Sequence, residues 1–102
     1  MSLANKVLQS DEFNYYEKVE LVTQLNKDKG IDHIERIPVE SSNIESIGYS
    51  GYILEVEFQG GSVYRYPEVP IEVYKELMEA DSHGSYFHRN VKEAGYDYYQ
   101  VK

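Results

Sequence analysis

Apolar residues follow a helical period in the first third of the chain and a strand period after it. Between residues 11 and 29 they recur at three- and four-residue spacing, which predicts a helix with the apolar stripe Phe13, Tyr16, Val19, Val22 and Leu25. Ser10 or Asp11 can cap the start of this helix, and Gly30 stands where a helix end favours a positive φ. Residues 31–38 then connect to the rest of the chain, because Pro38 disfavours further helix.

From Ile44 apolar positions alternate with polar ones, which predicts strands buried on one face. Opposed residues must share a face, so each turn can be placed by matching faces. A two-residue turn at Ser50-Gly51 gives the pairs Tyr49–Tyr52 and Ile47–Leu54. A three-residue loop over residues 60–62 gives the pairs Phe58–Tyr64, Glu57–Arg65 and Val56–Tyr66. We therefore predict a three-stranded antiparallel meander.

Two further helices are predicted after these strands. Pro70 suits the first turn of a helix whose apolar stripe is Ile71, Tyr74, Leu77 and Met78, and residues 81–85 break it. A second, short helix runs from about Ser85 to Ala94 and ends at Gly95, with its inward side chains being Tyr86, Phe87 and Val91. Alternation over residues 96–101 leaves open a fourth, C-terminal strand.

These elements make an α+β domain in which two helices pack on the aromatic face of the meander. We divide the chain into an N-terminal helical extension, residues 1–36, and an α+β domain, residues 37–102, within one globular unit. Three places remain open for the N-terminal helix: it can complete the core, cover Ile53 and Val63 on the other face, or pair with a second copy in a homodimer. We favour packing within the same chain, because residues 31–37 are enough to turn back.

Composition excludes several classes of function. The 102 residues include no cysteine, which excludes disulfide scaffolds, thiolate metal sites and cysteine nucleophiles. No apolar run approaches the roughly 20 residues that cross a bilayer, and no basic-then-apolar leader is present. We therefore expect a cytoplasmic protein without membrane contact, and set the first three residues aside as an expression leader.

The net charge of −8 disfavours RNA and DNA as partners, because neutralisation of phosphates supplies much of the affinity for them. Binding would need a local basic patch, for which the candidates are Arg65, Arg89, Lys92 and Lys102. Arg89 and Lys92 are the nearest pair of cations in the second part of the chain, so they are the expected phosphate anchors.

Several short motifs occur in a fixed order over residues 37–101. They are Ser41-Ser42-Asn43-Ile44, Ile47-Gly48-Tyr49, Leu54-Glu55-Val56-Glu57-Phe58, Tyr64-Arg65-Tyr66, Val69-Pro70 and Gly84-Ser85-Tyr86-Phe87. In this order they resemble the KTSC domain, a short module named after its occurrence at the C-terminus of some lysyl-tRNA synthetases. The resemblance implies a small domain for which nucleic-acid binding is a hypothesis. The segment 96–101 lacks the proline and the basic residue expected near its end, which weakens an anion-binding role carried over from the family.

Tyr64 and Tyr66 share one face of their strand, and Arg65 points to the other. The two tyrosines can form a stacking platform for bases or can be core residues beneath the helices, and face matching favours the core. Arg65 then forms a weak surface pair with Glu57 on the open face. Tyr86 belongs to a C-terminal group of tyrosines that we regard as a candidate interaction surface, since the chain holds eleven tyrosines.

Patterns typical of catalytic or metal sites are absent from the sequence. His83 and His88 are five residues apart, whereas ligand pairs on a helix stand three or four apart, so neither a metal nor another cofactor is expected. Glu55 and Glu57 share the open face, where no burial would raise a carboxyl pKa. We predict a non-enzymatic binding module with an unknown protein partner. RNA binding is the alternative, and an enzyme whose site the sequence does not display is the second alternative.

Overall fold

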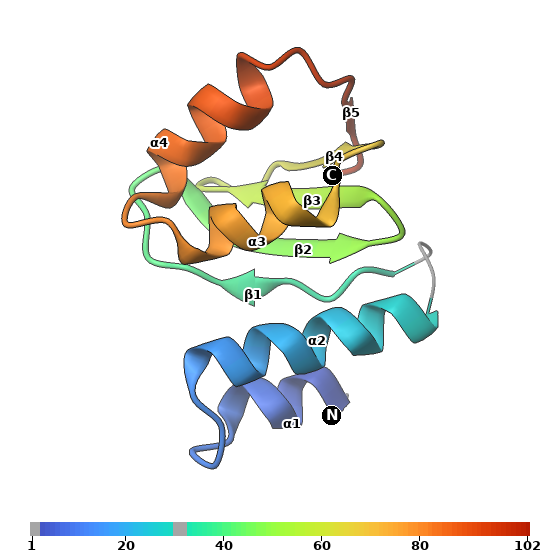
Figure 1. Ribbon diagram of the computed structural model, residues 1–102, viewed down its shortest axis with the longest axis vertical. Helices are drawn as coiled ribbons and strands as arrows, with labels where there is room; N and C mark the ends of the chain where they lie inside the picture. Colours follow the sequence, from blue (N-terminus) through green and yellow to red (C-terminus); the bar gives the residue numbers. More distant parts are fainter. Residues whose placement is uncertain (1–2, 30–32) are drawn as a thin grey trace.

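In residues 3–29 and 33–102, which the computed structural model describes, the chain forms a five-stranded antiparallel sheet. The helices that follow the fourth strand cover one face, and the two N-terminal helices lie beyond the edge formed by the first strand (Figure 1). The strands neighbour one another in sequence order: β1 (Ile37–Pro38), β2 (Ile44–Ser50), β3 (Ile53–Phe58), β4 (Val63–Tyr66) and β5 (Tyr99–Gln100). The helices are α1 (Leu3–Gln9), α2 (Tyr15–Lys29), α3 (Ile71–Glu79) and α4 (His83–Phe87), and α4 continues into the π-helical turn η1 (His88–Lys92).

The predicted α+β class and the antiparallel meander are confirmed, and β5 supplies the C-terminal strand that the alternation left open. The sequence did not predict β1 and α1. Within the described residues no helix combines the length and the apolar character that crossing a membrane requires.

Both hairpin loops have the predicted lengths but lie at different residues. The first turn is Gly51-Tyr52, both at positive φ (54° and 66°), and it sets Tyr49 opposite Leu54. The second loop occupies residues 59–61, and the pairs across it are Leu54–Tyr66, Glu55–Arg65 and Val56–Tyr64. The predicted pairs were wrong: each differs from the observed pair by two residues. Face matching could not detect this error, because a shift of two residues leaves every side chain on the same face.

The core lies between the sheet and the helices. Buried side chains of β2, β3 and β4 meet the predicted stripe of α3, namely Tyr74, Leu77 and Met78. Tyr74 stacks on Tyr49 with 5.0 Å between ring centroids and an interplanar angle of 15°. Phe87 of α4 and Val91 of η1 close the core at the β4 end, as their predicted inward positions require.

Helix α2 packs on the same core within its own chain, as favoured above. Val19 and Val22 are buried, and the Tyr15 hydroxyl donates to the Met78 carbonyl at 3.0 Å. Tyr16 does not belong to the buried stripe, because 61% of its surface is exposed. Helix α1 in turn lies against α2 (Figure 1).

Helix α2 begins later than predicted, at Tyr15. Asn14 Oδ1 accepts from the Glu17 backbone N–H at 2.9 Å, and Glu17 Oε1 accepts from the Asn14 N–H at 3.1 Å. This reciprocal pair is a capping box, so the predicted caps at Ser10 or Asp11 were wrong and Phe13 lies outside the helix. The predicted helix end at Gly30 lies outside the described residues.

Residues 34–36 lead into the edge strand β1 and pass in close contact with Gly48 of β2. A β-carbon at residue 48 would lie 2.5 Å from the Glu35 carbonyl oxygen and 2.8 Å from Ile34 Cγ2. The side chain of Asn26 holds this segment to α2: its amide donates to the Glu35 carbonyl at 2.9 Å and its oxygen accepts from the Glu35 N–H at 2.8 Å. The N-terminal extension therefore covers part of the face that the sequence left open.

Gly48→Ala should lower the free energy of unfolding by about 1–3 kcal/mol, because the added methyl group overlaps backbone that cannot move without losing the Asn26 bonds. Urea denaturation followed by circular dichroism measures the change. Gly84→Ala is the matched control, since its nearest neighbour, Ser41 Oγ, lies at an ordinary 3.5 Å. Equal losses in the two variants would refute the close contact at Gly48.

Candidate binding groove

An open cavity of about 290 Å³ lies where the end of the helical region faces β3, β4 and the C-terminal segment. It is lined by Phe58, Tyr64, Tyr66, Phe87, Lys92, Tyr96 and Tyr98. Phe87 packs edge-on against Tyr66 and Phe58, each at 5.5 Å between centroids. Tyr98, which is 64% exposed, lies 5.7 Å from Tyr66 and 5.9 Å from Tyr64. The cavity thus has a buried aromatic base and an exposed aromatic rim.

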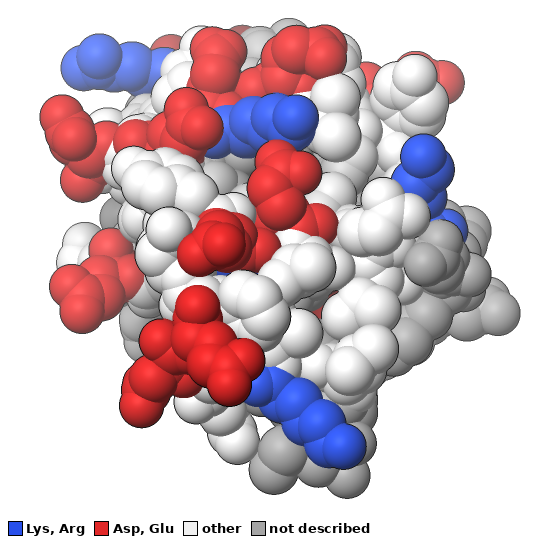
Figure 2. Space-filling model, turned by 60° about the horizontal axis from the view of Figure 1, so that its bottom comes forward, with Lys and Arg blue, Asp and Glu red and all other residues white. Residues whose placement is uncertain are grey.

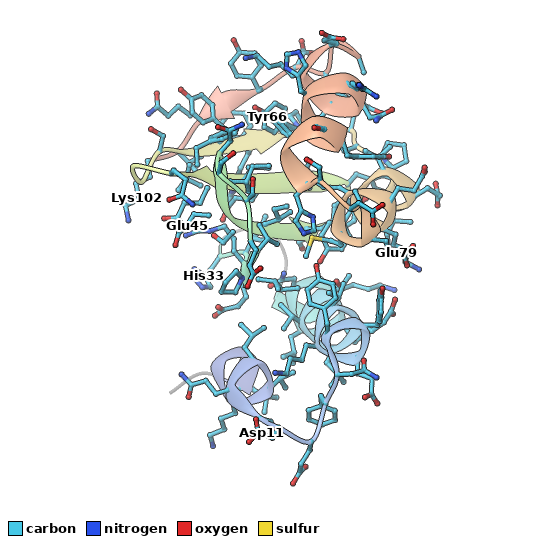
Figure 3. The ribbon with its side chains drawn as sticks, turned by 90° about the vertical axis from the view of Figure 1, so that its left-hand side faces the viewer. Asp11, His33, Glu45, Tyr66, Glu79 and Lys102 are labelled. Atoms are coloured by element: carbon cyan, nitrogen blue, oxygen red, sulfur yellow. The ribbon has the colours of Figure 1, made fainter. Side chains whose placement is uncertain are left out.

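Strand alternation explains why these rings meet. Tyr64 and Tyr66 occupy alternate positions of β4, so both turn toward the helices. Strand β5 pairs with β4 through Tyr64–Gln100, and Tyr98 shares the face of Gln100 two residues earlier. The Tyr64 hydroxyl lies 3.5 Å from Gln100 Oε1, at the limit of a hydrogen bond. Figure 3 shows Tyr66 between the sheet and the α4 end of the helical layer.

A second cavity of about 370 Å³ adjoins the first and is lined by fewer aromatic and more small polar side chains. Phe58, Phe87 and Lys92 line both, and the others lining the second are Ser42, Asn43, Ile44, Gln59, Gly84 and His88. We call the two cavities together the tyrosine groove, with an aromatic half and a polar half. At its helical wall the chain widens into a π turn, in which the Glu93 N–H donates to the His88 carbonyl at 2.9 Å. Such turns occur frequently at functional sites.

The tyrosine groove differs in charge from the rest of this acidic protein. Among the described residues that line it, Lys92 and His88 are the basic ones and none is Asp or Glu. By contrast, Figure 2 shows acidic groups outnumbering basic ones on the face that includes the N-terminal helices. Within the described part of the chain no carboxylate lies within ion-pair distance of Lys92, and the nearby Glu93 carboxylate contacts His88 Nε2 at 2.9 Å. The groove therefore suits a partially apolar group with a negative end.

Burial raises the pKa of Tyr66 to about 12, and the neighbouring phenols of Tyr98 and Tyr64 add to the shift. The Tyr66 hydroxyl consequently stays protonated over the physiological range. At the base of the groove it is a neutral polar group rather than a source of negative charge.

The structure brings Tyr64, Tyr66 and Lys92 of the predicted site together and leaves the others apart. The core interpretation of Tyr66 is confirmed, since 6% of its surface is exposed, whereas Tyr64 is half-buried. Tyr86 packs against the core outside the groove, and burial followed by the proximity of Glu76 raises its pKa. Arg89 is exposed and lines neither cavity.

Tyr98 is another of the C-terminal tyrosines, and it was not part of the predicted site. Its signal was the alternation of residues 96–101, which places it on the face of Tyr64 and Tyr66 once β5 pairs with β4.

Arg65 lies on the opposite face of the sheet, where its predicted surface pair with Glu57 is wrong. Its Nε donates to Glu55 Oε1 at 2.7 Å, and Arg36 Nη1 donates to Glu55 Oε2 at 2.6 Å. The Glu55 residue is 3% exposed, so it is not on an open face. Arg65 pairs with Glu55 instead of Glu57 because the register of β4 differs from the predicted one by two residues. This face of the sheet is not open, because Arg36 and its neighbours lie against it.

Arg65 is held charged at this face. Burial is the largest influence on its pKa and lowers it, but the hydrogen bonds and attraction to Glu55 and Tyr99 together leave the pKa raised. Arg36 Nε also donates to Ser46 Oγ at 2.9 Å, and Ser46 donates to Glu57 Oε1 at 2.8 Å. This back-face ion cluster of Arg36, Ser46, Glu55, Glu57 and Arg65 connects β2, β3 and β4 behind the tyrosine groove.

The two histidines of the helical region bond to different partners. His83 Nδ1 lies 2.8 Å from the Leu77 carbonyl, whereas His88 Nε2 faces Glu93. In the residues that the structure describes, no three His, Asp or Glu side chains gather as a metal ion requires.

Comparison with known proteins places these features in a family. The KTSC domain model matches residues 40–98, which confirms the resemblance inferred from the motifs. The crystal structure of a KTSC domain protein from Yersinia pestis matches with a TM-score of 0.59 and 32% identity, covering 69% of this chain and 100% of that chain.

Two sequence relatives differ greatly in length. An uncharacterized protein from Stutzerimonas stutzeri is 43% identical over 70 residues, which cover 67% of this chain and 99% of that protein. A lysine–tRNA ligase from Trichormus variabilis is 51% identical over 39 residues, which cover 38% of this chain and 7% of the ligase.

Proposed function

Since this chain belongs to the KTSC domain family, we propose that it is a non-enzymatic binding module whose tyrosine groove holds a segment of a partner protein. The observation that carries the proposal is the open aromatic half, in which the exposed ring of Tyr98 stands over the buried rings of Tyr66 and Phe87. Six of the seven side chains that line the aromatic half are aromatic.

Aromatic rings suit protein recognition because they bury a large area and lose little conformational entropy. The aromatic half, at about 290 Å³, lies at the small end of ligand pockets, so it accommodates a side chain better than a large cofactor. Its wall is preformed, because Tyr66 and Phe87 are core residues that binding does not need to reorganise. One apolar or aromatic side chain of the partner would therefore fill it.

Single-stranded RNA is the second candidate, and the match to a lysine–tRNA ligase favours it. Tyr98 and Tyr64 could stack a base while Lys92 contacts a phosphate. The net charge of −8 and the distance of Arg89 from the groove argue against a path along several phosphates. We therefore rank RNA below a protein segment.

Selection of a random peptide library on the folded protein tests the proposal. Selected peptides should share an apolar or aromatic position, and their affinity should fall at least about tenfold on Tyr98→Ala. Tyr52→Ala is the matched control, because Tyr52 is equally exposed (66%) but lies at the first hairpin turn. Peptides that bind equally well to the Tyr98 variant would overturn the proposal. Salt-sensitive binding of an RNA oligonucleotide that depends on Tyr98 would favour the second candidate.

A further inference from the structure

We propose that the polar half of the tyrosine groove is a carboxylate site, and that the bound segment is the C-terminal end of a partner chain. The terminal residue places its apolar or aromatic side chain in the aromatic half and its α-carboxylate beside Lys92. The inference rests on the function proposed above and adds the chemistry of the ligand.

Three side chains line both cavities: Phe58, Phe87 and Lys92. Of these, Lys92 carries a positive charge. A negative group that pairs with Lys92 can therefore belong to the same residue whose side chain occupies the aromatic half. Ser42 and Asn43 also line the polar half, and their side chains carry a hydroxyl and an amide that can donate hydrogen bonds to carboxylate oxygens.

The overall negative charge of the protein does not prevent a carboxylate from binding beside Lys92. Charges on the protein surface are screened over about 8 Å at physiological ionic strength, so the groups that line the groove decide its local potential. The basic residues among these groups are Lys92 and His88, and the other side chains that line the groove are uncharged. The adjacent Glu93 carboxylate is in contact with His88. The local balance thus favours one anion, not a long polyanion.

Chain geometry favours a terminal carboxylate over an acidic side chain. Successive side chains of an extended segment point to opposite faces, so an acidic neighbour of the anchoring residue would point away from the groove. An acidic side chain two positions away shares the face but lies roughly 7 Å farther along the segment. The α-carboxylate belongs to the anchoring residue itself, which matches a cation shared by the two halves.

NMR titration of the ¹⁵N-labelled protein with two matched probes tests the carboxylate site. N-acetyl-L-phenylalanine should shift the amide signals of residues 87–92 and 98 and should bind about two- to fivefold more tightly than N-acetyl-L-phenylalanine amide. Lys92→Gln should abolish that difference and retain binding of the amide. Arg89→Gln, one turn away and outside the groove, should leave the difference unchanged.

Each other outcome has a distinct meaning. Equal affinity of the two probes overturns the carboxylate site and leaves the protein-binding function standing, whereas no shift at the groove with either probe overturns both. Equally tight binding of the amidated peptide acetyl-Phe-Gly-Asp would replace the chain terminus with an internal acid and so overturn the C-terminal assignment. Tighter binding of uridine 5′-monophosphate at the same amides would overturn it in favour of a nucleotide.

Discussion

Glu55→Ala should lower the free energy of unfolding by about 3–5 kcal/mol, one of the two largest effects that we expect in this protein. The substitution leaves the guanidinium groups of Arg36 and Arg65 without the carboxylate that both contact, at 2.6 and 2.7 Å. Removing one partner of a buried ion pair lowers stability by more than the intact pair adds to it, because the remaining charge is left buried without a partner. The Arg36 and Arg65 side chains retain 26% and 14% exposure, so screening by water favours the lower end of the range.

Chemical denaturation of Glu55→Ala beside Glu45→Ala measures this effect. Glu45 is an exposed residue of the neighbouring strand β2, so its substitution should change stability by less than about 0.5 kcal/mol. If the two variants unfold at the same urea concentration, the cluster behaves as the weak surface pair that the sequence predicted for Arg65.

Tyr66→Ala should lower the free energy of unfolding by about 3–5 kcal/mol, as is typical of large aromatic truncations in a core. The ring packs edge-on against Phe87 and is continuous with the buried cluster of β3 and α3. Truncation leaves a cavity at the base of the tyrosine groove that the neighbouring rings can fill only in part.

Thermal and urea unfolding of Tyr66→Ala and Tyr66→Phe separate the two roles of this residue. Tyr66→Phe keeps the ring and nearly all of its volume, so it should lower the free energy of unfolding by under about 1.5 kcal/mol. An alanine variant that melts at the wild-type temperature but no longer binds selected peptides would make Tyr66 a recognition residue instead of a core residue.

Local pattern was enough to predict the elements and their faces, because burial imposes a period on each of them. The alternation at Leu54, Val56 and Phe58 predicted a strand, and the stripe of Tyr74, Leu77 and Met78 predicted a helix that buries those residues. The core position of Tyr66 followed from the same parity.

The local sequence pattern could not predict the register of the strands or the packing of distant chain segments on the sheet. Parity cannot distinguish pairings that differ by two residues, so Tyr66 was set opposite Val56 when it faces Leu54. Nothing in the local pattern shows that residues 34–36 pack against Gly48, so Glu55 was interpreted as solvent-exposed. The tyrosine groove was recognised in part, because Tyr64, Tyr66 and Lys92 lie in motifs while Tyr98 joins them through a strand pairing.

The contacts at Gly48 extend the packed structure beyond the segment that the family model matches. The family model starts at residue 40, but the backbone that occupies the space above Gly48 and the first guanidinium that reaches Glu55 come from residues 34–36. A protein that carried residues 40–98 alone would present a bare glycine groove and a half-neutralised buried carboxylate. We therefore expect a fragment limited to residues 40–98 to be less stable than one that begins at residue 33, because it loses the contacts of residues 34–36 with Gly48 and Glu55.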